Sequence, residues 1–224
     1  MKKFLALFIV LTFLIIPAVQ VSAVWETGTI GESVKWVYDG YGKLTISGTG
    51  AMEDYEFKGA PWQKYKGELR NVVIEEGVTY IGANAFNLAD SSYIHTDIES
   101  ISIPASVTAI HKDAFKETAV SGITVHRDNP SYICEGGVLF NKAKTELLIF
   151  PASDLIYAYT VPESVTKIAN EAFRFNPKLI ELTILDNVTE IGENILYNFD
   201  KRIQYNLYND NNRLNMYEIF KSVD

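Results

Sequence analysis

One apolar pattern recurs through residues 69–199 and constrains the fold more than any other feature of the chain. Leu, Ile or Val at the first, fourth and sixth positions, an L-x-x-L-x-L form, occurs five times. Four copies are followed by a Val-Thr-x-Ile segment, and three of these by an Ala-Phe pair. A unit of this size cannot bury its own apolar face, so the units must stack with equivalent residues above one another. The five patterns begin at Leu69, Ile98, Val120, Ile156 and Leu179.

Equivalent residues of successive copies are separated by a step typical of leucine-rich repeats. Phe86 and Phe115 are 29 residues apart, and Phe173 and Leu196 are 23 apart. Both steps fall in the range of about 20–29 residues for such repeats. The sequence therefore predicts a repeat solenoid, a right-handed superhelix with a curved parallel β-sheet. We expect short helical, 3-10 or irregular segments on its convex side and an N-terminal β-hairpin cap.

Residues 1–23 resemble a bacterial signal peptide. Lys2 and Lys3 precede an apolar run that ends at Ile16, and small residues lead to a cleavage position after Ala23. An uncleaved membrane anchor is the alternative, but the run is interrupted and shorter than the roughly 20 residues of a spanning helix. We therefore expect no membrane insertion after cleavage, and a mature protein that is secreted, extracellular or held at the cell surface.

The acidic balance of the chain bears on its partners. The formal charge is −8, and cleavage after Ala23 would make it −10 because two lysines and no acidic residue are removed. Nucleic acids and anionic lipid surfaces attract clustered Lys and Arg, and no basic run occurs in the mature sequence. We therefore expect no nucleic-acid partner.

Residues 24–68 precede the repeats and predict an N-terminal β cap. Two alternating segments, around Trp36 and Leu44, flank the turn residues Asp39–Gly42, which is the pattern of a hairpin. Such a hairpin would cover the apolar rungs and strand edges at the end of a solenoid. We expect Trp36 and Trp62 to plug that end.

The repeat region, 69–199, contains one insertion at about 132–151. After Val125 the Val-Thr-x-Ile segment of the third copy is replaced by two apolar runs, Gly136–Phe140 and Glu146–Phe150, around a polar turn. Two such runs predict a β-hairpin. It could project from the solenoid or fill the core in place of the missing half-repeat, and we expect a mixture of both.

The pattern fades after the last repeat, and residues 200–224 are expected to form a C-terminal cap. Leu214 and Tyr217 have the spacing of a short amphipathic helix. This helix would close the second end of the solenoid.

Residues that point inward from each strand are expected to form the core, and residues that point outward form a candidate binding surface. Phe86, Phe115 and Phe173 hold the same position in three copies and are expected to stack as an aromatic spine. Solenoids bind partners through exposed sheet faces, although Thr and Ser also occur in strands for backbone fit and solubility alone. The candidate binding residues are Val73, Ser102, Thr124, Thr160 and Thr183 in the exposed row, with Glu75, His126 and Glu181 beside it.

The sequence contains no recognisable catalytic or metal-binding pattern. Gly48–Gly50 lacks the third glycine and the Lys-Ser or Lys-Thr of a phosphate loop. His95, His111 and His126 show no metal-ligand spacing among themselves or with Cys134. We therefore expect a protein that is not an enzyme, with no catalytic residues, no metal and no cofactor.

The segment Ile98–Phe115 resembles the repeat of BspA-like leucine-rich repeat proteins of bacterial surfaces, which reads L-x-x-[VI]-x-I-P-x-x-V-T-x-I-G-x-x-A-F. Leu44–Met52 resembles the segment that commonly precedes those repeats, and Gly137–Pro151 resembles their inserted hairpin. His111 and Ala169 depart from the pattern, because they stand where the repeat has glycine. The resemblance implies adhesion or contact with a host or another cell. We expect a non-catalytic protein that recognises another macromolecule through the exposed side of its parallel sheet or through the inserted hairpin.

Two alternatives concern the partner and the role. Trp62, Tyr205 and Tyr208 lie outside the predicted repeat core and could form a carbohydrate or cell-wall binding module. The chain could also be a structural element of a surface layer. We expect a monomer whose partner is another protein or a surface glycan.

Overall fold

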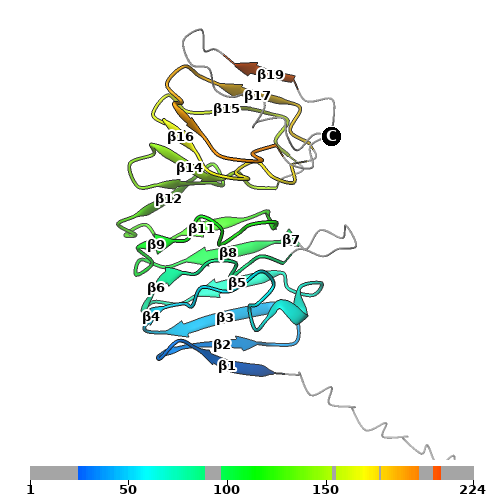
Figure 1. Cartoon of the computed structure of the whole chain (residues 1–224), viewed down its shortest axis with the longest axis vertical. Helices are drawn as coiled ribbons and strands as arrows, with labels where there is room; N and C mark the ends of the chain where they lie inside the picture. Colours follow the sequence, from blue (N-terminus) through cyan, green and yellow to red (C-terminus); the bar gives the residue numbers. More distant parts are fainter. Residues whose placement is uncertain (1–24, 89–96, 153–154, 177, 197–203, 208–224) are drawn as a thin grey trace, which may run out of the picture.

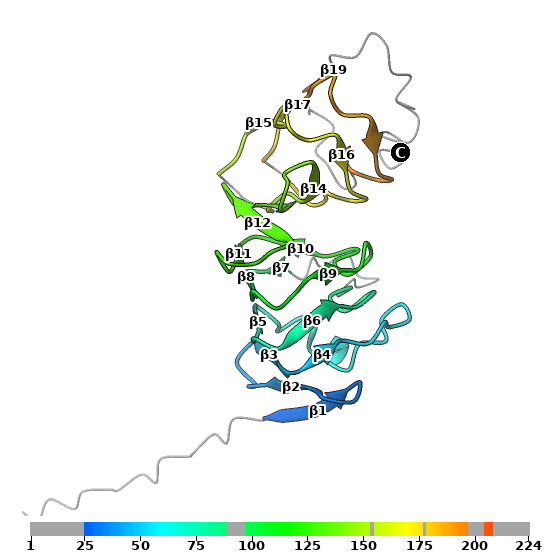
Figure 2. The same ribbon diagram turned by 90° about the vertical axis from the view of Figure 1, so that its left-hand side faces the viewer.

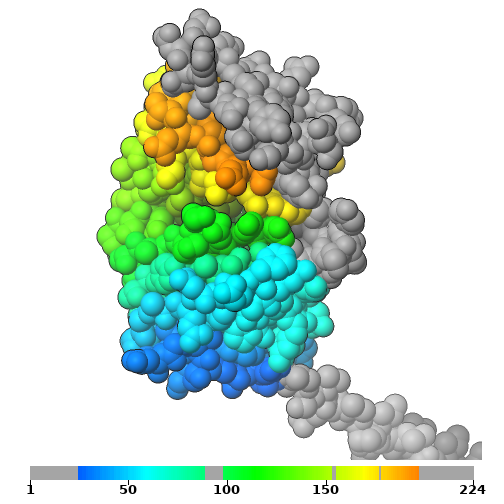
Figure 3. All heavy atoms as spheres, viewed as in Figure 1, coloured from blue at the N-terminus to red at the C-terminus, as the bar shows by residue number. Residues whose placement is uncertain are grey.

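The computed structural model shows short strands stacked along the long axis of the molecule, from β1 at one end to β19 at the other (Figure 1). The predicted signal peptide, the predicted C-terminal helix and Tyr208 lie outside the described residues. Successive colours form bands one above another on the surface (Figure 3). The structure describes residues 25–88, 97–152, 155–176, 178–196 and 204–207.

A six-stranded sheet contains the first three of the five predicted strand patterns. The first three strands of the sheet pair antiparallel, with the predicted hairpin turn at Asp39–Gly42 joining the second to the third. From the third strand onward the pairings are parallel. Val72 pairs with Leu44 on one side and Ile101 on the other, so equivalent apolar residues stack as predicted. The strands, in sheet order, are β1 (Glu26–Ile30), β2 (Val34–Tyr38), β3 (Lys43–Gly48), β5 (Asn71–Ile74), β8 (Ser100–Ile103) and β11 (Ile123–Val125).

The Val-Thr-x-Ile segments form short parallel strands on another side of the stack (Figure 2). The prediction of helical, 3-10 or irregular structure was wrong for these segments, because β-branched Val, Thr and Ile favour extended backbone. Among the described residues, the 3-10 helix η1 (Gln63–Tyr65) is the only helix. The strands here are β4 (Gly50–Ala51), β6 (Val78–Ile81) and β9 (Ala109–Ile110), and a separate pair joins β7 (Asp97–Ile98) to β10 (Ala119–Val120).

The turns that carry the Ala-Phe pairs are irregular, as predicted. The residue before the pair has a positive φ at Asn84 (52°) and Glu171 (55°), and the corresponding Asn194 has 54°. Gly82 approaches the neighbouring coil so closely that a Cβ there would lie 1.8 Å from the Glu53 carbonyl oxygen. A glycine is therefore needed in this turn, while Ala169 is accommodated in the corresponding turn of a later coil.

The insertion in the third copy is a three-stranded antiparallel meander rather than a simple hairpin. Its first strand was not predicted, although Gly136 and Gly137, with φ of 59° and 85°, form the turn that follows it. Val138, Leu139 and Phe140 are all buried, so the insertion fills the core and the projecting part of the prediction was wrong. The strands are β12 (Tyr132–Glu135), β13 (Val138–Asn141) and β14 (Glu146–Ile149), and β14 continues in parallel to β16 (Lys167–Ile168) and β18 (Glu190–Ile191).

The main parallel sheet is interrupted by this meander, so the prediction of one continuous sheet was wrong. β11 has no partner strand on its far side in the described part of the chain. β12 lies there instead, and the Cys134 thiol donates to the Ile123 carbonyl oxygen at 3.1 Å. The last two predicted strands form a second sheet, and a strand from the segment expected to be a cap extends it. These strands are β15 (Ala158–Thr160), β17 (Glu181–Ile184) and β19 (Gln204–Leu207).

The apolar core divides at the same place. Phe86 stacks on Phe115 with ring centroids 5.3 Å apart, whereas Phe173 packs against Phe150 of the insertion at 5.0 Å. The predicted spine of three rings was therefore wrong, because the insertion separates its second and third members. Trp62 is fully buried and stacks on Phe86 at 6.1 Å.

Candidate binding surfaces

Four aligned side chains on the six-stranded sheet form the first candidate surface, here called the first face. Val73 pairs with Ser102, and Ser102 pairs with Thr124, as the predicted row requires. Thr45 of β3 pairs with Val73 and extends the row. The predicted row did not include Thr45, because its strand, β3, was assigned to the cap. In the structure β3 pairs with β5 in parallel. Thr124 is exposed and the other three are partly exposed.

Thr160 and Thr183 lie on the other sheet and form a second face. They are paired in register with each other, but no strand pairing joins them to Thr124 in the described residues. The prediction of one row of five residues was therefore wrong. The meander occupies the place where the row would have continued.

The three flanking residues also divide between the faces. Glu75 and His126 follow β5 and β11, and their N–H groups donate to the carbonyl oxygens of Ile46 and Ile103, each at 2.9 Å. Both side chains are exposed at the carboxyl edge of the first face. Glu181 begins β17 beside the second face. The first face therefore offers hydroxyl and apolar side chains, with a carboxylate and an imidazole along one edge.

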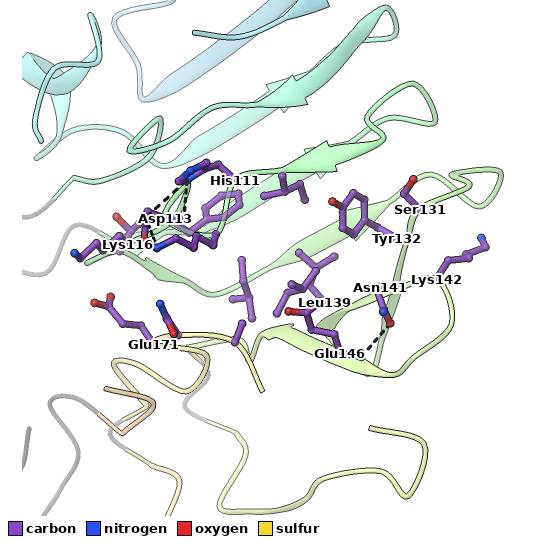
Figure 4. Close-up of a pocket in the computed structure, with 18 of the residues that line it drawn as sticks. His111, Asp113, Lys116, Ser131, Tyr132, Leu139, Asn141, Lys142, Glu146 and Glu171 are labelled. Atoms are coloured by element: carbon purple, nitrogen blue, oxygen red, sulfur yellow. Dashed lines mark hydrogen bonds and ion pairs between the residues drawn. The ribbon is translucent and has the colours of Figure 1, made fainter. Parts of the chain in front are cut away.

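A cavity of about 610 Å³ lies between β9 and the inserted meander, and the sequence analysis did not predict it. Figure 4 shows His111, Asp113, Lys116 and Glu171 at one end and Tyr132, Asn141, Lys142 and Glu146 at the other. The remaining lining includes the apolar side chains of Ile110, Phe115, Leu139, Leu148 and Ile149. We call this cavity the junction pocket. It has a mixed lining with charged groups at both ends.

The junction pocket exists because the third copy lacks its Val-Thr-x-Ile segment. In the fourth and fifth copies that segment forms β16 and β18, which pair with each other in parallel. In the third copy β14 takes this place beside β16, but its other edge is paired with β13 and not with β9. A missing half-repeat between complete ones was the sequence signal that could have predicted a gap here.

Three of the four carboxylates that line the pocket are ion-paired. Asp113 lies 3.1 Å from the Lys112 ammonium group, and Glu146 lies 3.3 Å from that of Lys167. Glu171 is the most buried of them. Its Oε2 lies 2.8 Å from the Arg174 guanidinium and accepts from the Glu117 N–H at 2.9 Å.

Tyr132 is the ionisable side chain of the pocket with a shifted pKa. Burial raises the pKa of its hydroxyl, and the neighbouring Ile110 N–H acts in the opposite direction. The Tyr132 hydroxyl therefore stays protonated near neutral pH and lies against the backbone of β9.

The described residues offer no metal site and no membrane span. No group of three or more His, Cys, Asp or Glu among them is arranged to hold a metal ion, and His95 lies outside them. No helix in the described ranges is long and apolar enough to cross a bilayer.

The proposed carbohydrate motif is not supported at Trp62. Its side chain is 0% exposed, and the indole N–H donates to the Ala85 carbonyl oxygen at 2.7 Å. The ring therefore cannot stack on a sugar, and the assumption that it lies outside the core was wrong. Of the other two residues of that motif, Tyr205 lies in β19 and Tyr208 lies outside the described residues.

Comparison with protein-family models tests whether the repeat belongs to a known family. The model of the BspA type leucine-rich repeat region matches six copies, over residues 64–136 and 87–223. The chain belongs to the BspA-type leucine-rich repeat family. The resemblance seen in Ile98–Phe115 is thereby confirmed. No curated protein matches this BspA-type chain.

Three solved structures are similar to the BspA-type chain. A leucine rich cell surface protein from Faecalibacterium prausnitzii is 19% identical, with a TM-score of 0.51, over 82% of this chain and 76% of that one. A leucine-rich repeat protein from Eubacterium ventriosum is 23% identical, with a TM-score of 0.44, over 83% and 73%. The pneumococcal vaccine antigen PcpA is 24% identical, with a TM-score of 0.49, over 63% and 39%. The Faecalibacterium protein shares the fold.

Proposed function

We propose that this BspA-type chain is a secreted or cell-surface protein without catalytic activity that recognises another protein through its first face. The observation that carries the proposal is the register of Thr45, Val73, Ser102 and Thr124 on consecutive strands. Strands of one sheet hold such a row rigidly, so little side-chain and backbone freedom is lost on binding. Repeat proteins of this kind use extended surfaces for recognition.

The surface location rests on two supports. The leader-like segment 1–23 has the arrangement of a secretory signal. The Faecalibacterium protein with the same fold is described as a cell surface protein. Adhesion would follow if the recognised protein belongs to another cell or to a host surface.

Lysine substitution on the first face is expected to abolish capture of the partner. In the double variant Ser102→Lys and Thr124→Lys, two ammonium groups would stand on adjacent paired positions and add charge to an uncharged part of the surface. The measurement is quantitative pull-down from cell-surface extracts with immobilised mature protein. We expect at least about a tenfold loss of the captured protein, since an unmatched charge at an interface costs several kcal/mol.

The second face supplies a matched control. Thr160→Lys and Thr183→Lys make the same change on paired positions of the other sheet and should leave capture unchanged. Circular dichroism of both double variants shows whether they keep the fold. Capture that survives the first-face substitutions, or that is lost only with the second-face ones, contradicts the proposal.

We further propose that the coils wind as a right-handed superhelix that is capped at its N-terminal end by β1 and β2. Crossovers between parallel strands are almost always right-handed. Val34, Trp36 and Tyr38 of β2 are buried against the first coil, so β2 covers an apolar end and the edge of β3.

Removal of residues 24–38 is expected to convert a monomer into a self-associating species, because it exposes the apolar residues of β3 and a bare strand edge. Multi-angle light scattering across a concentration series measures this change. A truncated protein that stays monomeric at every concentration would show that β1 and β2 do not act as a cap.

A further inference from the structure

Hydrogen bonds between coils follow one rule along the Val-Thr-x-Ile side of the stack. The N–H of the Thr donates to a carbonyl oxygen of the preceding coil, as for Thr108 to Thr79 at 2.9 Å and Thr189 to Thr166 at 2.8 Å. The residue after the Ile donates in the same way, as for His111 to Ile81 at 2.9 Å. The carbonyl oxygens of the Thr and the Ile are thus the acceptors that each coil offers to the next.

The corresponding carbonyl oxygens of β9 have no backbone donor from the next coil among the described residues. In the described part of the chain β9 pairs with β6 only, and no backbone N–H there donates to the carbonyl oxygen of Thr108 or Ile110. The third copy has no Val-Thr-x-Ile segment to supply the donors. The edge of β9 that faces the junction pocket therefore has no strand partner in the described residues, and an added strand would displace the Tyr132 hydroxyl from its place beside the Ile110 N–H.

The pocket has the size and lining for an extended segment with an apolar centre. Its volume of about 610 Å³ lies within the usual range of about 300–1,000 Å³ for ligand sites. Ile110 and Phe115 line it from the β9 side, and Leu139 and Leu148 line it from the meander. Side chains that alternate along an added strand would place one apolar group among these residues.

The charges fix the direction of the segment. Lys116 lines the end that follows β9, and Glu193, hydrogen-bonded through its backbone to Glu171, lines the same end. Lys142 lines the end near the start of β9 together with Glu146, but Glu146 is paired with Lys167 at 3.3 Å. No carboxylate of the described residues lies within ion-pair distance of the Lys142 ammonium group, which donates to the Arg127 carbonyl oxygen at 3.5 Å. A strand parallel to β9 would begin at the Lys142 end, so an acidic residue before its apolar part would meet this lysine.

We propose that the junction pocket binds an extended peptide segment of a partner protein, which adds a parallel strand to β9. The segment has a Val, Thr or Ile centre and an acidic residue on its amino side. Backbone N–H groups of the segment donate to the carbonyl oxygens of Thr108 and Ile110, and its carboxylate pairs with Lys142. This mode of recognition combines main-chain hydrogen bonds for affinity with side-chain pockets for specificity. It does not depend on the first face.

The chain itself provides a probe with these properties. Residues 163–170, Glu-Ser-Val-Thr-Lys-Ile-Ala-Asn, contain the segment that pairs with β14. The N–H groups of Thr166 and Lys167 donate to the Thr145 carbonyl oxygen just before β14, and that of Ala169 donates to the Leu147 carbonyl oxygen. A fluorescein-labelled synthetic peptide of this sequence is expected to bind the intact mature protein, with fluorescence anisotropy as the readout. The same peptide with N-methyl groups at the positions of Thr166, Lys167 and Ala169 lacks all three donors. We expect it to bind at least about tenfold more weakly, since the carbonyl oxygens of Thr108 and Ile110 lose the donors that the unmodified peptide supplies.

Charge reversal tests the direction of binding. Lys142→Glu is expected to weaken binding about tenfold, and a peptide carrying Glu163→Lys should restore much of it. Lys35→Glu makes the same charge change at an exposed position of β2, outside the pocket, and should leave binding unchanged. The double variant Ser102→Lys and Thr124→Lys should also bind the peptide normally, which separates this site from the first face.

Three results would overturn the inference. These are no saturable binding up to millimolar peptide, equal binding of the N-methylated peptide, and equal binding to the Lys142→Glu protein. Peptide binding that is lost in the first-face variant would place the site on the sheet face and would count against the junction pocket as well.

Discussion

Replacing Phe86 by Ala is expected to lower the free energy of unfolding by about 3–5 kcal/mol, the range for a fully buried Phe. The ring is 0% exposed and lies between Trp62 and Phe115, with centroid distances of 6.1 and 5.3 Å. Its loss leaves a cavity where two coils meet, and the neighbouring rings cannot close it without moving the backbone. Urea denaturation followed by tryptophan fluorescence measures the change, since Trp62 reports on this contact directly.

Phe115 is the matched control for Phe86. It occupies the same position in the next coil, but its ring is only partly buried because it lines the junction pocket. Phe115→Ala should cost less than about 2 kcal/mol, because less apolar area is removed from the core. Equal losses for the two variants would mean that the pocket is closed in solution, and a loss under about 1 kcal/mol at Phe86 would contradict its place in the core.

Replacing Asn129 by Ala is expected to lower the free energy of unfolding by about 3 kcal/mol, since each buried polar group left without a partner costs about 1–3 kcal/mol. The side chain is 0% exposed. Its amide nitrogen donates to the carbonyl oxygens of Pro104 (2.7 Å) and Val107 (2.9 Å), and its oxygen accepts from the N–H groups of Ser131 (2.8 Å) and Tyr132 (2.7 Å). It thus joins the second coil to the start of the meander, and thermal denaturation measures the loss.

The variant Asn129→Asp gives this prediction a pH dependence. A carboxylate keeps both acceptor contacts but cannot donate to the two carbonyl oxygens, so burial and these oxygens should raise the pKa of the Asp above its ordinary value of about 3.9. The protonated form can donate one of the two bonds. The stability deficit relative to wild type should therefore be smallest below about pH 4 and should grow as the pH rises through the folded-state pKa.

Asn141→Ala is the comparison for a less buried amide. Asn141 accepts from the N–H groups of Thr145 and Glu146 at 2.8 and 3.1 Å in a partly exposed turn. Water can replace the lost oxygen there, so the cost should stay near about 1 kcal/mol. A loss at Asn129 no larger than that at Asn141 would contradict the structural role assigned to Asn129.

The strand pattern predicted the stacked coils because the alternation of inward and outward residues is local information. Val72, Ile101 and Leu182 are buried at their expected positions, and each needs only its own strand to be placed. Val125, Ile156 and Tyr159 have the same pattern but are only partly buried, because they flank the insertion. The sequence showed which side of each strand is apolar but not which strand edges meet.

Predicting the candidate surfaces required knowing which strands pair with each other. Thr124 and Thr160 were placed in one row because their repeats follow each other in sequence, but the meander stands between their strands. The turn at Gly136–Gly137 is a known hairpin signal, and it would have added β12 to the prediction. No motif marks the junction pocket, and its only sequence signal is the Val-Thr-x-Ile segment that the third copy lacks.

The division of the apolar core has a consequence for how the protein opens. Leu139 belongs to one cluster and Val138 and Phe140 to the other, so a single strand, β13, inserts side chains into both. In a repeat protein each unit is stabilised mainly by its nearest neighbours, and local opening follows such cooperative units. We therefore expect the molecule to open as two cooperative units joined by β13, so that the C-terminal unit can unfold while the unit that carries the first face stays folded.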